Sequence, residues 1–172
     1  MKKQADKIYL IGFMGCGKSY IGKQLAQSLG WEFLDMDDFL EAKEGKSISQ
    51  IFAEGGATLF RKLEQNYLHA TYDFKNTIIA TGGGAPCFFD NIDWMNDNGA
   101  TIYLKTPVPI LFDRLKSETN HRPLLAGKTD TQLKEFIAHK LSERYPFYEQ
   151  AQNIFEYKTG KENAGSLLEI LE

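Results

Sequence analysis

The sequence predicts an α/β fold, with a five-stranded parallel sheet between two layers of helices. Short apolar segments typical of strands alternate along the chain with segments whose apolar residues recur at helical spacing. Such alternation favours right-handed crossovers, which make the strands parallel and place helices on both faces of the sheet. A glycine-rich loop also stands between the first strand and the first helix. We therefore expect a three-layer α/β/α sandwich.

The first strand is expected at residues 7–11, where consecutive apolar residues form a short buried-strand pattern. The first helix is expected at residues 18–29, because apolar residues recur there at helical spacing. Gly30 would end that helix as a left-handed C-cap.

The later elements follow the same two patterns. Strands are expected near residues 32–34, 77–80, 101–104 and 153–157. Helices are expected at residues 38–43, 48–53, 57–72, 107–117, 131–145 and 163–171. Pro107 stands at a helix start, where proline is tolerated. The segment 119–129 is polar and contains a proline and a glycine, so we expect a mobile lid that closes over a ligand.

Length and composition narrow the class of protein. At 172 residues the chain predicts a single domain, 1–172, which needs no disulfide or structural metal to hold a core. Cys16 and Cys87 lack metal-ligand spacing, so reduced thiols are expected. The net charge of −3, with scattered basic residues, argues against nucleic-acid and anionic-membrane surfaces. No apolar run approaches the ~18 residues of a membrane span, and a cytoplasmic location is expected.

Residues 12–19 read GFMGCGKS, a GxxxxGKS motif directly after the first strand. Its glycines let the loop curl until successive backbone N–H groups point inward at an anion. Lys18 adds a charge that reaches the β- and γ-phosphates, and the Ser19 hydroxyl is placed to ligate Mg²⁺. The loop residues assigned to ATP are Gly15, Cys16, Gly17, Lys18 and Ser19. The motif and its flanks predict a domain of the P-loop NTPase type.

Two acidic residues follow the second strand, at the edge where open parallel sheets bind ligands. Asp35 and Asp37 are two apart, a spacing that places both carboxylates on one side at a strand end. One would help to hold Mg²⁺, and the other would accept a proton from a hydroxyl nucleophile. The alternative is that these acids cap the following helix, for which Asp38 is well placed.

Three consecutive glycines, residues 82–84, follow the third strand. They cost backbone entropy, and their benefit appears where another group must approach the main chain closely. A small substrate is one such group, and a flexible turn is the alternative. No aspartate stands at this strand end, which favours Asp35 as the Mg²⁺ contributor.

Three arginines complete the predicted site. Arg61 is an i,i+3 neighbour of Glu64, so the alternative to a functional role is an exposed ion pair. Arg122 lies in the predicted lid, where the alternative is a solvated charge. Arg144 stands two residues before Pro146, where we expect the helix to break and the guanidinium to be aimed.

Taken together, these segments resemble the shikimate kinase family over nearly the whole chain. The matching motifs are GxxGxGKS at 12–19, FxDxD at 33–37, FRxxE at 60–64, GGG at 82–84, RPLL at 122–125 and RYPFYEQA at 144–151. Many families share the first motif, and the other five in this order are far more specific. The resemblance implies an ATP-dependent phosphotransferase that phosphorylates the 3-hydroxyl of shikimate in aromatic amino acid biosynthesis.

The resemblance also implies roles for individual residues. Asp37 would hold ring hydroxyls and act as the base, within a substrate-binding helical region at 37–64. The substrate carboxylate would be gripped by Arg61, Arg144, Gly83 and Gly84, with Glu64 orienting Arg61. Mg²⁺ would be served by Ser19 and Asp35, the transferring phosphoryl group by Lys18 and Arg122, and the adenine side by Arg114.

Some positions depart from the family pattern. Tyr20 stands where threonine is common, so only its backbone N–H is assigned to ATP. Residues 158–162 match less clearly, and no base contact is assigned there. We also hypothesise that alkylation of Cys16 blocks ATP binding, since the thiol lies inside the loop.

Two other readings stay open from the sequence. A kinase of a sugar acid or a nucleoside monophosphate would share the loop, the sheet and the lid. A regulatory nucleotide-binding module without turnover, or a GTP switch, is the second class, although no NKxD guanine motif occurs. The expected partners are ATP and shikimate, with no nucleic acid and no membrane, and a monomer is expected.

Overall fold

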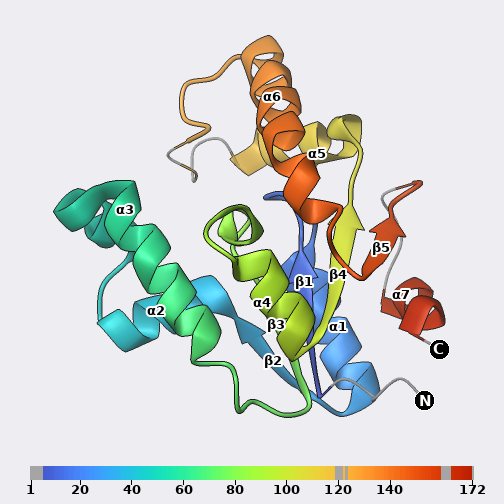
Figure 1. The fold of residues 1–172 in the computed structure, drawn as a ribbon. Helices are drawn as coiled ribbons and strands as arrows, with labels where there is room; N and C mark the ends of the chain where they lie inside the picture. Colours follow the sequence, from blue (N-terminus) through green and yellow to red (C-terminus); the bar gives the residue numbers. More distant parts are fainter. Residues whose placement is uncertain (1–5, 119–121, 123, 160–163, 172) are drawn as a thin grey trace.

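The computed structural model describes residues 6–118, 122, 124–159 and 164–171. They form a five-stranded parallel sheet in the order β2-β3-β1-β4-β5 (Figure 1). The strands are β1 (Lys7–Ile11), β2 (Glu32–Asp35), β3 (Thr77–Ala80), β4 (Ala100–Lys105) and β5 (Asn153–Glu156). In the central strand, Leu10 lies opposite Ala80 of β3 and Ile102 of β4. The predicted fold class and strand order along the chain are confirmed.

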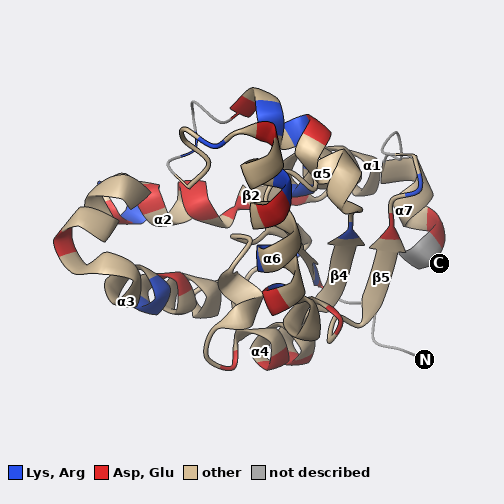
Figure 2. Ribbon diagram, turned by 90° about the horizontal axis from the view of Figure 1, so that it is seen from above, with Lys and Arg blue, Asp and Glu red and all other residues tan. Residues whose placement is uncertain are grey.

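Helices cover both faces of this sheet. They are α1 (Lys18–Leu29), α2 (Met36–Glu44), α3 (Ile48–His69), α4 (Asn91–Asn98), α5 (Val108–Leu115), α6 (Asp130–Tyr148) and α7 (Ala164–Leu171), with 3₁₀ turns at Ala85–Cys87 and Lys116–Glu118. Figures 1 and 2 show α1 and α7 on one face and α4 on the other, and α2 and α3 to one side of the sheet. Acidic and basic residues are interspersed over these helices (Figure 2). Within the described ranges, no helix is long and apolar enough to cross a membrane.

The first helix shows how the sequence sets an element's bounds. Ile21 and Leu25 are fully buried, so the apolar stripe of α1 faces the sheet. Gly30 has φ 66° and donates its N–H to the carbonyls of Ala26 and Gln27, which ends the helix as predicted.

Four elements differ from the expectation. α6 continues through Pro146 to Tyr148, so the prediction that proline breaks this helix is wrong. Its last turn is held by the Glu149 N–H, which donates to the Tyr145 carbonyl, and by the burial of Tyr148. The helices expected at 48–53 and 57–72 are one run with a break at Gly56, which has φ 66° and ψ −164°.

The other two elements that differ from the expectation are α4 and the 3₁₀ turn at Ala85–Cys87, neither of which was expected from the sequence. The sequence of α4 is mostly polar, and Ile92 and Met95 are its buried apolar side chains. The Asn91 amide donates to the Ala85 carbonyl at 2.9 Å, so the helix start is fixed by a side-chain contact to the preceding turn that periodicity does not reveal.

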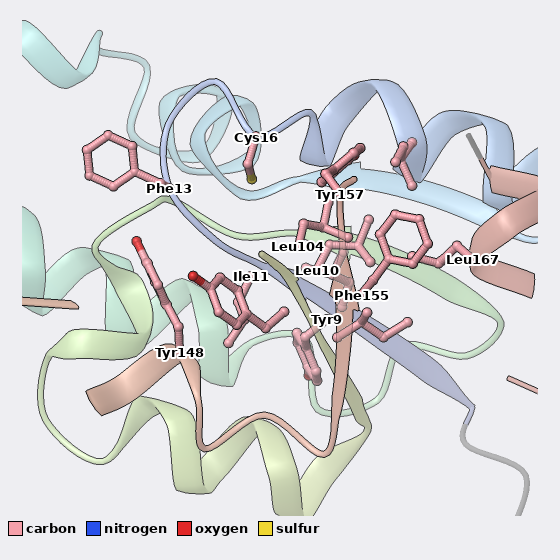
Figure 3. Close-up of a cluster of buried hydrophobic side chains, with 14 of the residues drawn as sticks. Tyr9, Leu10, Ile11, Phe13, Cys16, Leu104, Tyr148, Phe155, Tyr157 and Leu167 are labelled. Atoms are coloured by element: carbon pink, nitrogen blue, oxygen red, sulfur yellow. The ribbon is translucent and has the colours of Figure 1, made fainter. Parts of the chain in front are cut away.

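The main core lies between the sheet and its helices. All five residues of β1 are buried, and Figure 3 shows Tyr9, Leu10 and Ile11 packed among apolar side chains of β4, β5 and α7. A smaller cluster of Leu40, Ile51 and Phe60 joins α2 to α3. This second cluster holds the two helices of the predicted substrate-binding region at 37–64 against each other.

Candidate active site

The phosphate loop runs from the end of β1 to the start of α1. Gly12, Gly15 and Gly17 have φ of 147°, 78° and 94°, values that side chains other than glycine rarely adopt. A Cβ at Gly15 would lie 2.9 Å from the Leu115 side chain, so space as well as conformation requires glycine there. The loop therefore delivers the N-terminus of α1, with its unpaired N–H groups, to the rim of a cavity.

Lys18 folds back over this loop. Its ammonium donates to the Gly12 carbonyl at 2.8 Å and to the Phe13 carbonyl at 3.1 Å. The same side chain lines the cavity, so a bound anion can compete for a charge that the loop holds in place.

Ser19 and Asp35 form a second polar pair in the cavity. The Ser19 hydroxyl donates to Asp35 Oδ2 at 2.6 Å, while Asp35 Oδ1 accepts from the Asp37 N–H at 3.0 Å and the Asp38 N–H at 3.5 Å. Asp35 therefore caps α2, a role that the sequence assigned most readily to Asp38. Asp35 therefore fits both the metal-site and the helix-cap interpretation, because Oδ2 faces the Ser19 hydroxyl and Oδ1 faces the N–H groups of α2.

The oxygens of Ser19 and Asp35 fit a hard divalent cation. Hydroxyl and carboxylate oxygens are ligands that Mg²⁺ prefers, and the pair is close enough to share one coordination sphere with phosphate oxygens and water. No cluster of three or more His, Cys, Asp or Glu side chains that could hold a metal occurs in the described residues.

Asp37 lies in the first turn of α2 and not on the strand, so the expected strand-end geometry with Asp35 is wrong. Both side chains nevertheless line the same cavity. Burial is the main cause that raises the pKa of Asp37, the nearby Asp35 carboxylate raises it further, and Lys18 opposes the shift. A carboxylate with a raised pKa is a stronger base than a free one.

Asp37→Asn is expected to make the fold more stable at neutral pH. Because the folded pKa of Asp37 lies above its usual value of 3.8, the folded state retains a proton that the unfolded state has released. Wild-type stability therefore falls as the pH rises from about 4 through the raised pKa, and the Asn variant lacks this loss. Thermal unfolding of both proteins from pH 3 to 8 measures the difference, and parallel curves would contradict it.

Each glycine of the 82–84 turn faces a different side chain of the site. A Cβ at Gly82 would lie 2.7 Å from Glu64 Oε2 and 3.2 Å from Asp37 Oδ1. A Cβ at Gly84 would lie 2.6 Å from Arg61 Nη2, and one at Gly83 would lie 3.4 Å from Arg144 Nη1. Close approach therefore explains Gly82 and Gly84, whereas the distance at Gly83 is that of an ordinary van der Waals contact. The turn gathers the base candidate and both arginines.

Arg61 is held on several sides. It donates to Glu64 Oε1 at 2.7 Å, and the Glu64 side chain is 4% exposed, so the alternative of an exposed ion pair is wrong. The guanidinium carbon lies 4.2 Å from the centre of the Phe88 ring and 5.0 Å from that of Phe60. Such contacts restrict the plane of the guanidinium.

Glu64 carries an unsatisfied polar atom at this point. Its Oε2 is buried without a hydrogen-bond partner in the described part of the chain. Burial raises the pKa of Glu64, whereas Arg61 lowers it. The ion pair with Arg61 is thus what keeps a carboxylate tolerable at a buried position.

The cavity beside the phosphate loop has a volume of about 780 Å³. The residues that were predicted from the sequence and that line this cavity are Gly15, Gly17, Lys18, Ser19, Tyr20, Asp35, Asp37, Gly83, Arg114 and Arg122. Arg61, Gly84 and Arg144 are not among its lining residues and lie at the glycine turn that forms its wall. The structure thus joins the two halves of the predicted site through one turn.

Two predicted nucleotide residues, Arg114 and Arg122, have partners of their own, and a third, Tyr20, is exposed. Arg114 donates to the Gly15 carbonyl at 3.1 Å and lies 5.1 Å from the centre of the Tyr157 ring. Arg122 pairs with Glu118 at 2.5 Å. Tyr20 is 65% exposed at the cavity rim. Of the other expectations, lid residues 119–121 and 123 and segment residues 160–162 lie outside the described residues.

Cys16 does not suit the alkylation hypothesis. Its side chain is completely buried, and Figure 3 shows the sulfur turned into the apolar cluster beside Leu10 and Leu104. Only its backbone can serve a nucleotide, and a bulky thiol reagent has no access in the folded state. The hypothesis that alkylation of this thiol blocks ATP binding stays a prediction, and it requires the reagent to reach a buried side chain.

Sequence reasoning missed several residues of the site. Met14, Glu118 and Tyr157 line the cavity, and Phe88 stacks on Arg61. Glu118 lies four residues before Arg122, and this i,i+4 spacing was the one signal that could have revealed a partner. Met14 lies within the phosphate-loop motif itself, whereas Tyr157 and Phe88 depend on contacts between distant segments.

Comparison with known proteins agrees with this geometry. The family model for shikimate kinase matches residues 14–172. A shikimate kinase of Parabacteroides distasonis is 45% identical over 150 residues, which cover 87% of each chain. The crystal structure of shikimate kinase from Bacteroides thetaiotaomicron has a TM-score of 0.87 at 41% identity and covers 96% of this chain and 93% of its own. The structure of the Acinetobacter baumannii enzyme in complex with shikimate has a TM-score of 0.78 at 33% identity and covers 95% of this chain and 88% of its own.

Proposed function

The chain belongs to the shikimate kinase family of P-loop kinases, and we propose that the residues gathered at its 82–84 turn carry out the reaction of that family. In this reaction the γ-phosphoryl group of ATP is transferred to the 3-hydroxyl of shikimate, which gives shikimate 3-phosphate and ADP. The observation that carries the assignment of roles is that Asp37, Arg61 and Arg144 meet at one turn beside the phosphate loop.

Arg61 and Arg144 would bind the shikimate carboxylate. A guanidinium presents two parallel N–H donors to a planar carboxylate, and Arg61 is already fixed in its plane by Glu64 and Phe88. The backbone of Gly83 and Gly84 would add contacts, and at Gly84 a side chain would clash with the Arg61 guanidinium. An analogue without the carboxylate would leave Arg61 and Arg144 without an anionic partner from the substrate, so the site would favour acceptors that carry a carboxylate.

Asp37 would accept the proton of the 3-hydroxyl as the oxygen attacks the γ-phosphorus. The bond from phosphorus to the bridging oxygen of ADP breaks as the new bond to the shikimate oxygen forms, and the proton stays on the Asp37 carboxylate until solvent removes it. Its raised pKa suits this task, because the carboxylate binds the proton more tightly than a solvated one would. Positioning of the hydroxyl supplies the rest of its contribution.

Lys18, Arg122 and the loop N–H groups would stabilise the charge on the phosphoryl oxygens. Phosphoryl transfer asks little covalent chemistry of the protein, so preorganised positive charge supplies most of the acceleration. Arg122 pairs with Glu118 in the structure, so it would exchange this carboxylate for the phosphoryl group when ATP is bound. Arg114, which lies between the Gly15 carbonyl and the Tyr157 ring, would face the adenine side.

Ser19 and Asp35 would hold Mg²⁺ together with ATP. The ion neutralises charge on the phosphates when it is bound. The protein's own part is to keep the two oxygens 2.6 Å apart, with Asp35 fixed by the N–H groups that it caps.

We also propose a cytoplasmic monomer. Both halves of the site come from one chain, so catalysis needs no partner subunit. The lid at 119–129 and the substrate-binding region at 37–64 remain predictions for the same single domain.

Purified protein is expected to release ADP from ATP only when shikimate and Mg²⁺ are both present. Omission of shikimate should leave only slow hydrolysis, because water is a poorly positioned acceptor, and chelation of Mg²⁺ should abolish turnover. A coupled ADP assay measures this, with gluconate and nucleoside monophosphates as alternative acceptors. Equal rates with and without shikimate, or faster turnover of another acceptor, would contradict the proposed function.

A further inference from the structure

Tyr148 makes a buried polar contact that no role assigned above explains. It is the last residue of α6, its side chain is fully buried, and its phenol donates to the Gly83 carbonyl at 2.5 Å. Figure 3 shows its hydroxyl pointing towards the end of the core cluster where Phe13 of the phosphate loop lies. The contact joins residues 65 positions apart, so it ties the end of α6 to the glycine turn.

The atom that Tyr148 holds determines the direction of a second group. A peptide unit is planar and trans, so the Gly83 carbonyl and the Gly84 N–H point in opposite directions along one plane. A hydrogen bond to the carbonyl from the core therefore turns the Gly84 N–H away from the core. Within the described residues this N–H has no hydrogen-bond acceptor, and the Arg61 guanidinium lies close by, since a Cβ at Gly84 would be 2.6 Å from Arg61 Nη2.

Tyr148 also lies beside Arg144, one turn earlier on the same helix. Burial is the main cause that raises the pKa of the Tyr148 phenol, while the nearby charge of Arg144 acts in the opposite direction. The phenol stays protonated and remains a donor across the physiological range. The same tyrosine thus contacts the turn and the arginine that the proposed function assigns to the carboxylate.

We propose that Tyr148 is a positioning residue for the acceptor substrate, which aims the Gly84 N–H and the Arg144 guanidinium at the shikimate carboxylate. This proposal rests on the proposed function for the identity of that substrate. Tyr148 acts through the turn and through Arg144, and it does not touch the reacting atoms. Loss of its hydroxyl would free the peptide plane, so the effect should fall on shikimate and not on ATP.

The chain offers a matched control in Tyr103. Its ring packs on that of Tyr148 with centroids 5.0 Å apart, it is almost completely buried, and its hydroxyl has no hydrogen-bond partner in the described part of the chain. Tyr103→Phe removes the same atom from the same cluster without breaking a contact to the site. A difference between the two variants therefore reports the hydrogen bond and not the repacking of the core.

Tyr148→Phe is expected to raise the KM for shikimate by 10-fold or more, with the KM for ATP within twofold of wild type. Tyr103→Phe should leave both constants within twofold. Incorporation of p-aminophenylalanine at position 148, which keeps an N–H donor, should recover part of the lost affinity. Equal KM values for shikimate in Tyr148→Phe and wild type would overturn the proposal, as would a parallel rise in both KM values.

A measurement on the unaltered protein keeps the inference testable if Tyr148→Phe does not fold. Amide exchange of the Gly84 N–H, followed by NMR, should slow by 10-fold or more when shikimate is added, and unchanged exchange would overturn the proposal. The wild-type assay separates the two ideas. If wild type does not turn over shikimate, the proposed function fails and this inference with it, whereas an active wild type with an equally active Tyr148→Phe variant contradicts the role of Tyr148 alone.

Discussion

Asp37→Asn is expected to lower kcat with shikimate by about 10²- to 10⁴-fold, the range that removal of a positioned general base produces. Asparagine has nearly the same shape and can still hold a ring hydroxyl, but it cannot take the proton. The Lys18 ammonium, the loop N–H groups and the Ser19 hydroxyl are unchanged, so the affinity for ATP should stay within a few-fold of wild type.

The control for this variant is Asp38→Asn. Asp38 is the next residue in the same first turn of α2, is exposed, and does not line the cavity, so its loss of charge tests the effect of net charge and helix dipole alone. Steady-state kinetics with both substrates and ATP titration of each variant provide the measurements. A kcat for Asp37→Asn within threefold of the control would remove this residue as the base.

Arg61→Ala is expected to raise the KM for shikimate by about 10- to 150-fold, which corresponds to the ~1.5–3 kcal/mol of a hydrogen bond to a charged group. The same change should also destabilise the protein, because Glu64 would become a buried carboxylate without its partner. Breaking a buried ion pair in this way costs ~3–5 kcal/mol. One substitution therefore affects both substrate binding and stability.

The double variant Arg61→Ala/Glu64→Gln separates these effects. It should recover much of the stability, since the buried charge is gone, without recovering the affinity for shikimate. Lys62→Ala, an exposed neighbour on the same helix, is the control for surface charge. If the double variant binds shikimate as wild type does, Arg61 acts only as the partner of Glu64 and the carboxylate clamp is wrong.

Local sequence patterns were sufficient to predict most of the framework. The strands and α1 are defined by apolar periodicity and by glycine at the helix end, and both signals act over a few residues. The phosphate loop was predictable for the same reason, since positive φ and a close approach both require glycine. α4 was not, because its sequence is mostly polar and its start is fixed by the contact of Asn91 with the preceding turn.

The residues of the site were predictable as a set, but their partners were not. The three glycines at 82–84 indicated that some group approaches the main chain closely. The sequence does not show that this group comprises the side chains of Glu64, Arg61 and Arg144. Phe88 acts on Arg61 from another element, and nothing in its own neighbourhood marks it. Tyr148 falls within the 144–151 motif, but the sequence does not show that its phenol reaches Gly83. Helix capping by Asp35 was left open as an alternative, and it occurs together with the Ser19 contact because the strand end and the helix start coincide.

A crystal structure with ADP, Mg²⁺ and shikimate tests the central claim most directly, which is that the phosphate loop and the arginine pair serve one acceptor across the 82–84 turn. We expect the shikimate carboxylate between Arg61 and Arg144 and its 3-hydroxyl within hydrogen-bonding distance of Asp37, facing the open phosphate end near Lys18. Shikimate bound with its carboxylate away from these arginines, or with its 3-hydroxyl beyond the reach of Asp37, would contradict the account.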